Sequence, residues 1–150
     1  MKTKEKEDFF SLFDHFPNTA IYHINDDCED INLLLEELVH NIEGELTTQD
    51  FNEIELKKFR LRDRNFEYAI VSDCLNKEDS EFTDRFITSI YHSLENSAFI
   101  ILLQTKNTIE ITQMIDTLDR NNFRAVNDIN IFDKYHLVMA KKLHMWGAGQ

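Results

Sequence analysis

Residues 98–103 read Ala-Phe-Ile-Ile-Leu-Leu, a continuously apolar run in a chain of 150 residues. A strand that exposes one face alternates apolar and polar side chains, whereas a strand buried on both faces is apolar throughout. The run therefore predicts a central strand of a parallel sheet with helices on both faces. It is much shorter than the roughly 20 residues that span a bilayer, so no membrane span is expected.

The segments around this run alternate between helical and strand periodicity. The helix predicted before it follows the polar stretch 76–80, and its apolar side chains are four residues apart, at Phe82, Phe86, Ile90 and Leu94. The helix predicted after it has its apolar side chains at Ile111, Met114, Ile115 and Leu118. Residues 66–73 predict another strand, and the β-rich runs 123–132 and 135–140 predict a closing hairpin-like pair.

The first half of the chain continues the alternation. A short helix is predicted to stop at Pro17, with one apolar face made of Phe9, Leu12, Phe13 and Phe16. A strand over 19–24 and a helix over 29–42 follow, and the apolar face of this helix is made of Ile31, Leu34, Leu35, Leu38 and Ile42. Gly44 is the predicted helix terminator, residues 47–52 a polar link and residues 54–61 a further strand.

This order predicts a layered α/β domain with right-handed crossovers. The length fits one domain over residues 1–143, of which 1–17 form an N-terminal helical segment, and 144–150 form a C-terminal tail.

The chain is acidic, with 28 acidic against 16 basic side chains and a net charge of −12. Residues 1–50 hold 13 of the acidic side chains and three lysines. Binding to duplex nucleic acid depends on cationic side chains that neutralise phosphates, so no such partner is expected. The acidic first third is interpreted as a solubility feature or as a docking surface for a basic partner.

Cysteine and histidine spacing gives no metal or disulfide signature. Cys28 and Cys74 are too few and too far apart for a disulfide framework or a zinc site, and no signal peptide is recognised, so a cytoplasmic location is expected. Glu37 and His40 have the spacing found in di-iron helix bundles, but the second such pair is missing from the sequence. No metal is expected.

The second half of the chain has a recognisable order of motifs. They are the strand Phe66-Glu-Tyr-Ala-Ile-Val-Ser-Asp73, the helix 82–95, the strand 98–105, the helix 109–120, Asn122-Phe123 and Tyr135-His-Leu-Val-Met-Ala-Lys-Lys142. Residues 66–142 thereby resemble the C-terminal half of the class I S-adenosylmethionine-dependent methyltransferases. The resemblance implies a three-layer Rossmann-like sandwich with a mostly parallel sheet and an antiparallel final strand, here shortened by about one strand-helix unit before Phe66.

The turn after the first strand departs from that family. A methyltransferase has a glycine-rich turn there because the backbone must approach the cofactor closely. This chain has Asn25-Asp-Asp-Cys-Glu-Asp30, with no glycine and four carboxylates that would repel the carboxylate of the cofactor. The departure favours a non-catalytic binding or assembly module without a cofactor. The alternative is a small S-adenosylmethionine-dependent methyltransferase whose rebuilt pocket uses Asn25, Asp26 and Asp73.

The strand that ends in Ser72-Asp73-Cys74 supplies the other candidate site residues. Ligands of open α/β sheets bind at the carboxyl ends of strands. Asp73 is a candidate to orient a substrate, Cys74 a candidate nucleophile, and Ser72 a candidate for cofactor binding beside Asn25 and Asp26. The alternative interpretation is that Ser72 and Asp73 end a strand and that Cys74 fills a buried space.

Residues 57–64 contain five basic side chains in eight residues. On a strand, one face would carry Lys58, Arg60, Arg62 and Arg64. This face is interpreted as a docking edge for an acidic partner or as a phosphate or nucleotide site. The alternatives are a charged edge that prevents aggregation and a face that balances the chain's own acidic helix.

The tail places Trp146 beside Gly-Ala-Gly. An aromatic side chain on a flexible segment can pack on its own domain, contact a second subunit in a homodimer, or bind another protein. All three remain open from the sequence.

Overall fold

The computed structural model describes residues 1–53, 66–76 and 79–143, and its strands form one sheet in the order β2-β1-β3-β4-β6-β5. The strands are β1 Ala20–Asn25, β2 Glu45–Asp50, β3 Phe66–Ser72, β4 Leu94–Thr105, β5 Arg124–Asp128 and β6 Tyr135–Lys141. The pairs β1/β2, β1/β3 and β3/β4 are parallel, and β4/β6 and β5/β6 are antiparallel. The mostly parallel sheet with an antiparallel final strand is thereby confirmed.

The apolar run 98–103 lies in β4, between β3 and β6. Ile100 and Leu102 have no exposed surface and belong to the core on one face of the sheet. Ile101 and Leu103 are equally buried and belong to the core on the other face. Successive side chains of a strand point to opposite faces, so two cores require an unbroken apolar sequence.

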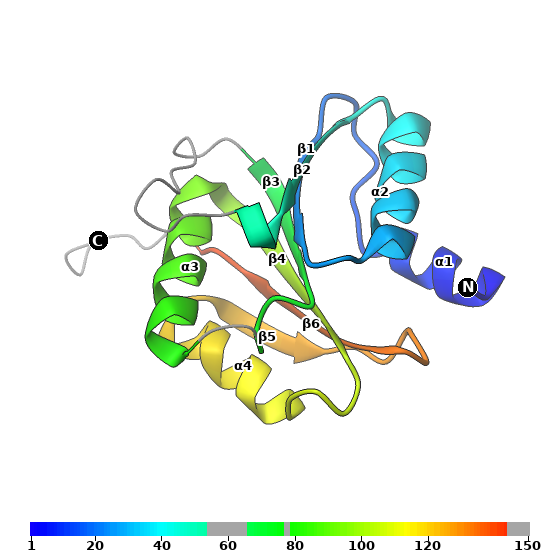
Figure 1. The fold of residues 1–150 in the computed structure, drawn as a ribbon. Helices are drawn as coiled ribbons and strands as arrows, with labels where there is room; N and C mark the ends of the chain where they lie inside the picture. The colour runs from blue at the N-terminus through cyan, green and yellow to red at the C-terminus, as the bar shows by residue number, and fades with distance from the viewer. Residues whose placement is uncertain (54–65, 77–78, 144–150) are drawn as a thin grey trace.

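Helices cover both faces of the sheet (Figure 1). They are α1 Thr3–Phe10, α2 Glu29–Ile42, α3 Ser80–Ser93 and α4 Ile111–Arg120. Apolar side chains of α1 and α2 form the core on one face, and those of α3 and α4 form the core on the other. The three-layer Rossmann-like sandwich is therefore confirmed.

The helix predicted over 29–42 has these bounds in the structure, and all five residues of its predicted apolar face are buried. The helix predicted after residues 76–80 begins at Ser80, where the carboxylate of Asp79 accepts a hydrogen bond from the backbone N–H of Phe82 at 2.8 Å. Such a cap satisfies one of the free N–H groups at a helix start and fixes where the helix begins.

The first helix begins and ends earlier than predicted. It ends at Phe10 and not at Pro17, so Phe13 packs into the core from the turn that follows the helix, and Phe16 is 66% exposed. The lysine-glutamate start is itself helical because both residue types are strong helix formers.

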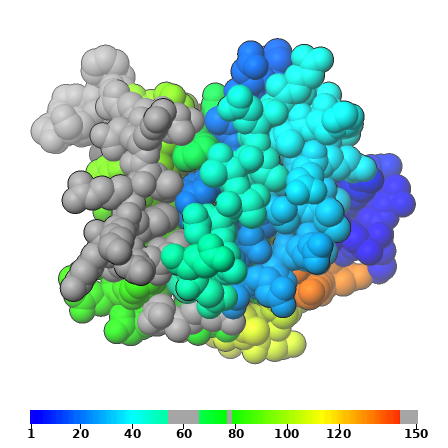
Figure 2. Space-filling model, turned by 45° about the horizontal axis from the view of Figure 1, so that its top comes forward, coloured from blue at the N-terminus to red at the C-terminus, as the bar shows by residue number. Residues whose placement is uncertain are grey.

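The polar link predicted over 47–52 is wrong, because residues 45–50 form β2. This strand pairs in parallel with β1, from Ala20 opposite Glu45 to Asn25 opposite Asp50. It is one of the two edge strands of the described sheet, lies at the surface beside α2 (Figure 2), and has no buried residue. An exposed strand lacks the apolar alternation by which strands are recognised.

The helix terminator also differs in detail. Glu43 takes the left-handed conformation at the end of α2, with φ 57°, and Gly44 follows it. Gly44 is required for close approach, because a Cβ there would lie 2.8 Å from the carbonyl oxygen of Thr19. The strand predicted over 54–61 and the tail 144–150 lie outside the described residues.

Candidate functional site

The candidate site is the carboxyl edge of the three neighbouring parallel strands β2, β1 and β3. Asn25 at the end of β1 is opposite Asp50 on one side and Ser72 on the other. The chain leaves β1 through α2 to reach β2, and β3 pairs with the other side of β1. The crevice at such a switch point is the usual ligand position of open α/β sheets.

The predicted Asn25 and Asp26 lie where β1 ends and the loop to α2 begins. The side-chain oxygen of Asn25 accepts a hydrogen bond from the backbone N–H of Cys28 at 3.1 Å. The carboxylate of Asp26 accepts one from the side-chain amide of Asn52 at 2.6 Å, so the loop is tied to the segment after β2. Asp27 has φ 58°, a conformation that favours glycine but that aspartate tolerates. The sharp turn is thus made without glycine.

Asp73 joins the ends of β3 and β4. Its carboxylate accepts hydrogen bonds from the backbone N–H and the hydroxyl of Thr105, at 2.6 and 2.8 Å, and from the thiol of Cys28 at 3.2 Å. Its own N–H donates to the carbonyl of Leu103 at 2.8 Å. The Asp73 carboxylate thus accepts three hydrogen bonds from the protein itself, and these link the end of β3 to the end of β4 and to the loop before α2.

The two thiols lie below this edge and are buried. Burial, followed by the hydrogen bond to Asp73, raises the pKa of Cys28 to about 12. The thiol of Cys74, the predicted nucleophile, contacts the carbonyl oxygens of Ser72 and Ile24 at 3.3 and 3.8 Å. Because a thiolate is the reactive form, Cys28 is unsuited to nucleophilic attack.

Tyr135, the first residue of β6, bonds to the start of α2. Its hydroxyl donates to the carboxylate of Asp30 at 2.9 Å, and burial raises the pKa of Tyr135 well above its ordinary value. Asp30 also accepts a hydrogen bond from the N–H of Ile31, within the first turn of α2.

A chain of polar side chains centred on the buried His23 was missed from the sequence. Its Nε2 lies 2.8 Å from the hydroxyl of Ser72, and its Nδ1 lies 2.9 Å from the side-chain oxygen of Asn32, which also accepts from the hydroxyl of Thr48. His23 and Ser72 have no exposed surface, and burial lowers the pKa of His23 to about 4. The signal for it was a lone histidine inside the apolar strand 19–24, and its partners lie 9 and 49 residues away.

Three of the predicted site residues, Asn25, Asp26 and Asp73, therefore gather at one edge of the sheet. Ser72 lies beneath this edge and bonds to His23. Asp50 and Asn52, which sequence reasoning did not single out, complete the edge, and the carboxylate of Asp50 accepts from the backbone N–H of Asn52 at 2.9 Å. The remaining candidates lie outside the described residues; they are Lys58, Arg60, Arg62, Arg64 and Trp146.

Two properties of residues 1–53, 66–76 and 79–143 bear on metals and membranes. No group of three or more of their histidine, cysteine, aspartate and glutamate side chains is placed to hold a metal ion, and Glu37 forms an ion pair with Lys6 at 2.6 Å. None of their helices is long and apolar enough to cross a membrane.

Solved structures with the same arrangement include S-adenosylmethionine-dependent methyltransferases. The enzyme from Aquifex aeolicus superposes with a TM-score of 0.73 at 11% identity, over 92% of this chain and 89% of that one. The enzyme from Mesorhizobium loti gives 0.59 at 10% identity, over 93% and 98% of the two chains. Human N-acetylserotonin methyltransferase gives 0.64 at 14% identity, and the match spans 52% of its length. No family model and no curated protein matches the sequence.

These likenesses define the class of fold. The chain has the fold of the class I S-adenosylmethionine-dependent methyltransferases, in a 150-residue version with six described strands.

Proposed function

We propose that the chain is a non-catalytic binding or assembly module on the methyltransferase fold. The observation that carries the proposal is the hydrogen bond of 2.6 Å between Asn52 and the carboxylate of Asp26, which ties the β1–α2 loop to the segment after β2. In a cofactor-binding α/β domain, the corresponding loop presents its backbone to the ligand. Here its side chains bond to the loop's own backbone and to Asn52 and Asp73 on neighbouring segments.

Charge supports the same conclusion. Residues 26–30 hold four carboxylates, and two of them, Glu29 and Asp30, are in the first turn of α2. Helix starts attract anions because their N–H groups are free and the helix dipole is positive there. Carboxylates already placed at this start oppose the carboxylate of S-adenosylmethionine.

A thermal-shift titration of the full chain tests the proposal. At a ligand concentration of 100 times Kd, a bound ligand stabilises a protein by about 2.7 kcal/mol, which raises the Tm of a 150-residue domain by roughly 5–10 °C. We expect no rise with about 1 mM S-adenosylmethionine or S-adenosylhomocysteine. A saturable rise of several degrees with either ligand would overturn the proposal.

The second candidate is a methyltransferase with a rebuilt pocket. It is favoured by Asp50, whose strand end is opposite Asn25, and by the acidic loop, since carboxylates attract the sulfonium and ammonium cations of the cofactor. Under this candidate, Asn25, Asp26 and Asp73 hold the cofactor, and Asp50→Asn weakens its binding. The titration above separates the two candidates, because only the methyltransferase requires the cofactor.

The partner of the proposed module is a protein, either a second copy or another chain. The acidic residues 1–50, the basic segment 57–64 and the tail containing Trp146 are the candidate contacts. Measuring the mass in solution of the full chain and of a chain lacking residues 145–150 tests self-association through the tail.

A further inference from the structure

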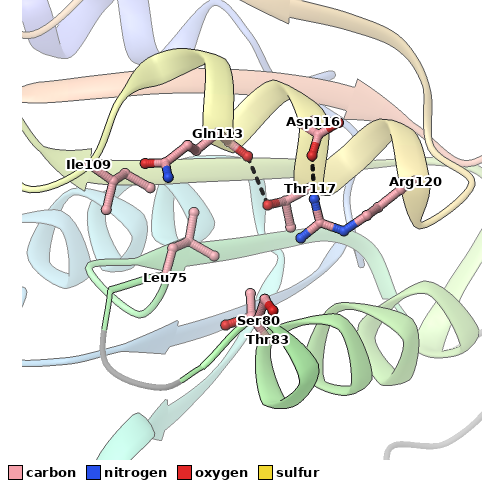
Figure 3. A pocket seen from close by; sticks show the side chains of 8 residues that line it. All are labelled: Leu75, Ser80, Thr83, Ile109, Gln113, Asp116, Thr117 and Arg120. Carbon is pink, nitrogen blue, oxygen red and sulfur yellow. Dashed lines mark hydrogen bonds and ion pairs between the residues drawn. The ribbon is translucent and has the colours of Figure 1, made fainter.

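A cavity of about 340 Å³ lies between α3 and α4, on the face of the sheet opposite α1 and α2 (Figure 3). None of the residues that line it forms the carboxyl edge described above. Its volume is within the range of small-molecule sites. Leu75 and Ile109 form one end of the cavity, and the guanidinium of Arg120 lies toward the other end.

Arg120 is held in place by two carboxylates. Its Nε donates to Asp84 on α3 at 3.0 Å, and its Nη1 donates to Asp116, one turn earlier on α4. No described residue accepts a hydrogen bond from its Nη2, which leaves two N–H groups for a ligand. Because the two carboxylates offset the cation, the site does not favour an anion over a neutral molecule.

The cavity is lined by both donor and acceptor groups. Asp116, an acceptor, lies beside Arg120, a donor, and its side chain is 69% exposed, so its oxygens are accessible. Gln113 uses its side-chain oxygen to accept from the N–H of Glu110 at 3.1 Å. Its NH₂ group is then the part that can donate, and Figure 3 shows it turned toward Leu75 and the cavity.

Hydroxyl groups line the space between these two ends. Thr83 donates to the carbonyl of Asp79 at 3.0 Å, and Thr117 donates to the carbonyl of Gln113 at 2.8 Å. Their oxygens can therefore only accept from a ligand.

We propose that this cavity binds a neutral planar ring that carries a lactam edge, the N–H and C=O pair of uracil-type bases. Nη2 of Arg120 donates to the ring carbonyl, and Asp116 accepts from the ring N–H. A lactam edge has an N–H donor next to a C=O acceptor, and the Arg120–Asp116 pair offers one donor and one acceptor. The second carbonyl accepts from Gln113, and the ring face packs on Leu75 and Ile109.

Uridine is the probe, and ¹⁵N-detected NMR of the full chain is the measurement. We expect saturable shifts of the Arg120 Nε–H and Gln113 side-chain amide signals. Binding of 3-methyluridine, in which a methyl group replaces the lactam hydrogen, should be about tenfold weaker, the effect of one lost hydrogen bond to a charged group. Adenosine has no lactam edge and should not shift these signals.

Two variants locate the site. Asp116→Ala removes the acceptor at an exposed position and should weaken uridine binding about tenfold, whereas Asp119→Ala removes the same charge from the same helix, outside the cavity, and should leave it unchanged. Gln113→Glu keeps the oxygen that caps α4 and removes the NH₂ donors, so it should also weaken binding.

Equal binding of uridine and 3-methyluridine, equal effects of the two aspartate variants, or no shift of the Arg120 and Gln113 signals would each overturn the inference. The inference is independent of the proposed function, because the cavity and the carboxyl edge have no residue in common. S-adenosylmethionine carries an adenine and no lactam, so the two titrations test different sites.

Discussion

Acidification of the buried His23 network is the perturbation with the best-defined magnitude. Burial lowers the pKa of His23 from 6.5 to about 4, so between these pH values the unfolded state binds a proton that the folded state does not. The neutral His23 therefore makes its full contribution to the free energy of unfolding above about pH 6.5, and the protein loses stability as the pH falls below this value. Linkage gives a loss of about 2 kcal/mol at pH 5 and about 3 kcal/mol at pH 4.

Urea unfolding of the full chain at several pH values between 7 and 4 measures this loss. His23→Gln retains a hydrogen-bonding side chain but cannot titrate, so its stability should fall less with acid than that of the natural chain. The difference between the two curves should change by about 2 kcal/mol between pH 7 and pH 5, and carboxylates that titrate in both proteins cancel.

His15→Gln is the control. His15 is exposed, and its ring nitrogen bonds to the carbonyl oxygen of Phe10, so this variant removes a surface histidine by the same substitution and leaves the His23 network intact. If His23→Gln and the natural chain lose stability in parallel, His23 is not buried neutral in solution and the reasoning is refuted.

Two further predictions rest on the fold, and two on sequence segments outside the described residues. Gly44→Ala should destabilise the domain by about 1–3 kcal/mol in urea unfolding, because its Cβ would meet the carbonyl of Thr19 at 2.8 Å; unchanged stability would contradict this contact. Cys28 and Cys74 should react with a thiol reagent at least about 100-fold more slowly in the folded chain than in denaturant, as measured by absorbance; equal rates would contradict their burial. Deletion of residues 145–150 should lower Tm or reduce the mass in solution, and a change in neither leaves an external partner as the role of the tail. Charge reversal of Arg60 and Arg62 should reduce capture of an acidic partner without loss of folding in circular dichroism; unchanged capture and folding would end the docking hypothesis.

The sequence predicts the centre of the fold well because burial is visible in the pattern. The run 98–103 must be apolar to fill two cores, and the face of α2 repeats every three to four residues. The edge of the sheet is different. β2 is exposed, so its Thr and Gln residues show no pattern, and the strand could be found only from its pairing with β1.

The candidate site was predicted in part for a similar reason. Asn25, Asp26 and Asp73 were found because strand ends are visible in the sequence. Asp50 and Asn52 were missed together with β2, and His23 was missed because its partner Ser72 is on another strand. The missing glycine was interpreted as favouring a module without a cofactor, and in the structure Asp27 takes the left-handed conformation itself, so the sharp turn is still made.

The central proposal is that the carboxyl edge, whose side chains bond to neighbouring segments of the chain, does not bind S-adenosylmethionine. The most direct test is an NMR titration of the full chain with S-adenosylhomocysteine, following the backbone amide signals of Asp26, Asp27, Asp50 and Asp73. The account predicts that these signals do not move at about millimolar ligand. Saturable shifts at all four positions, with a Kd in the micromolar range, would contradict it.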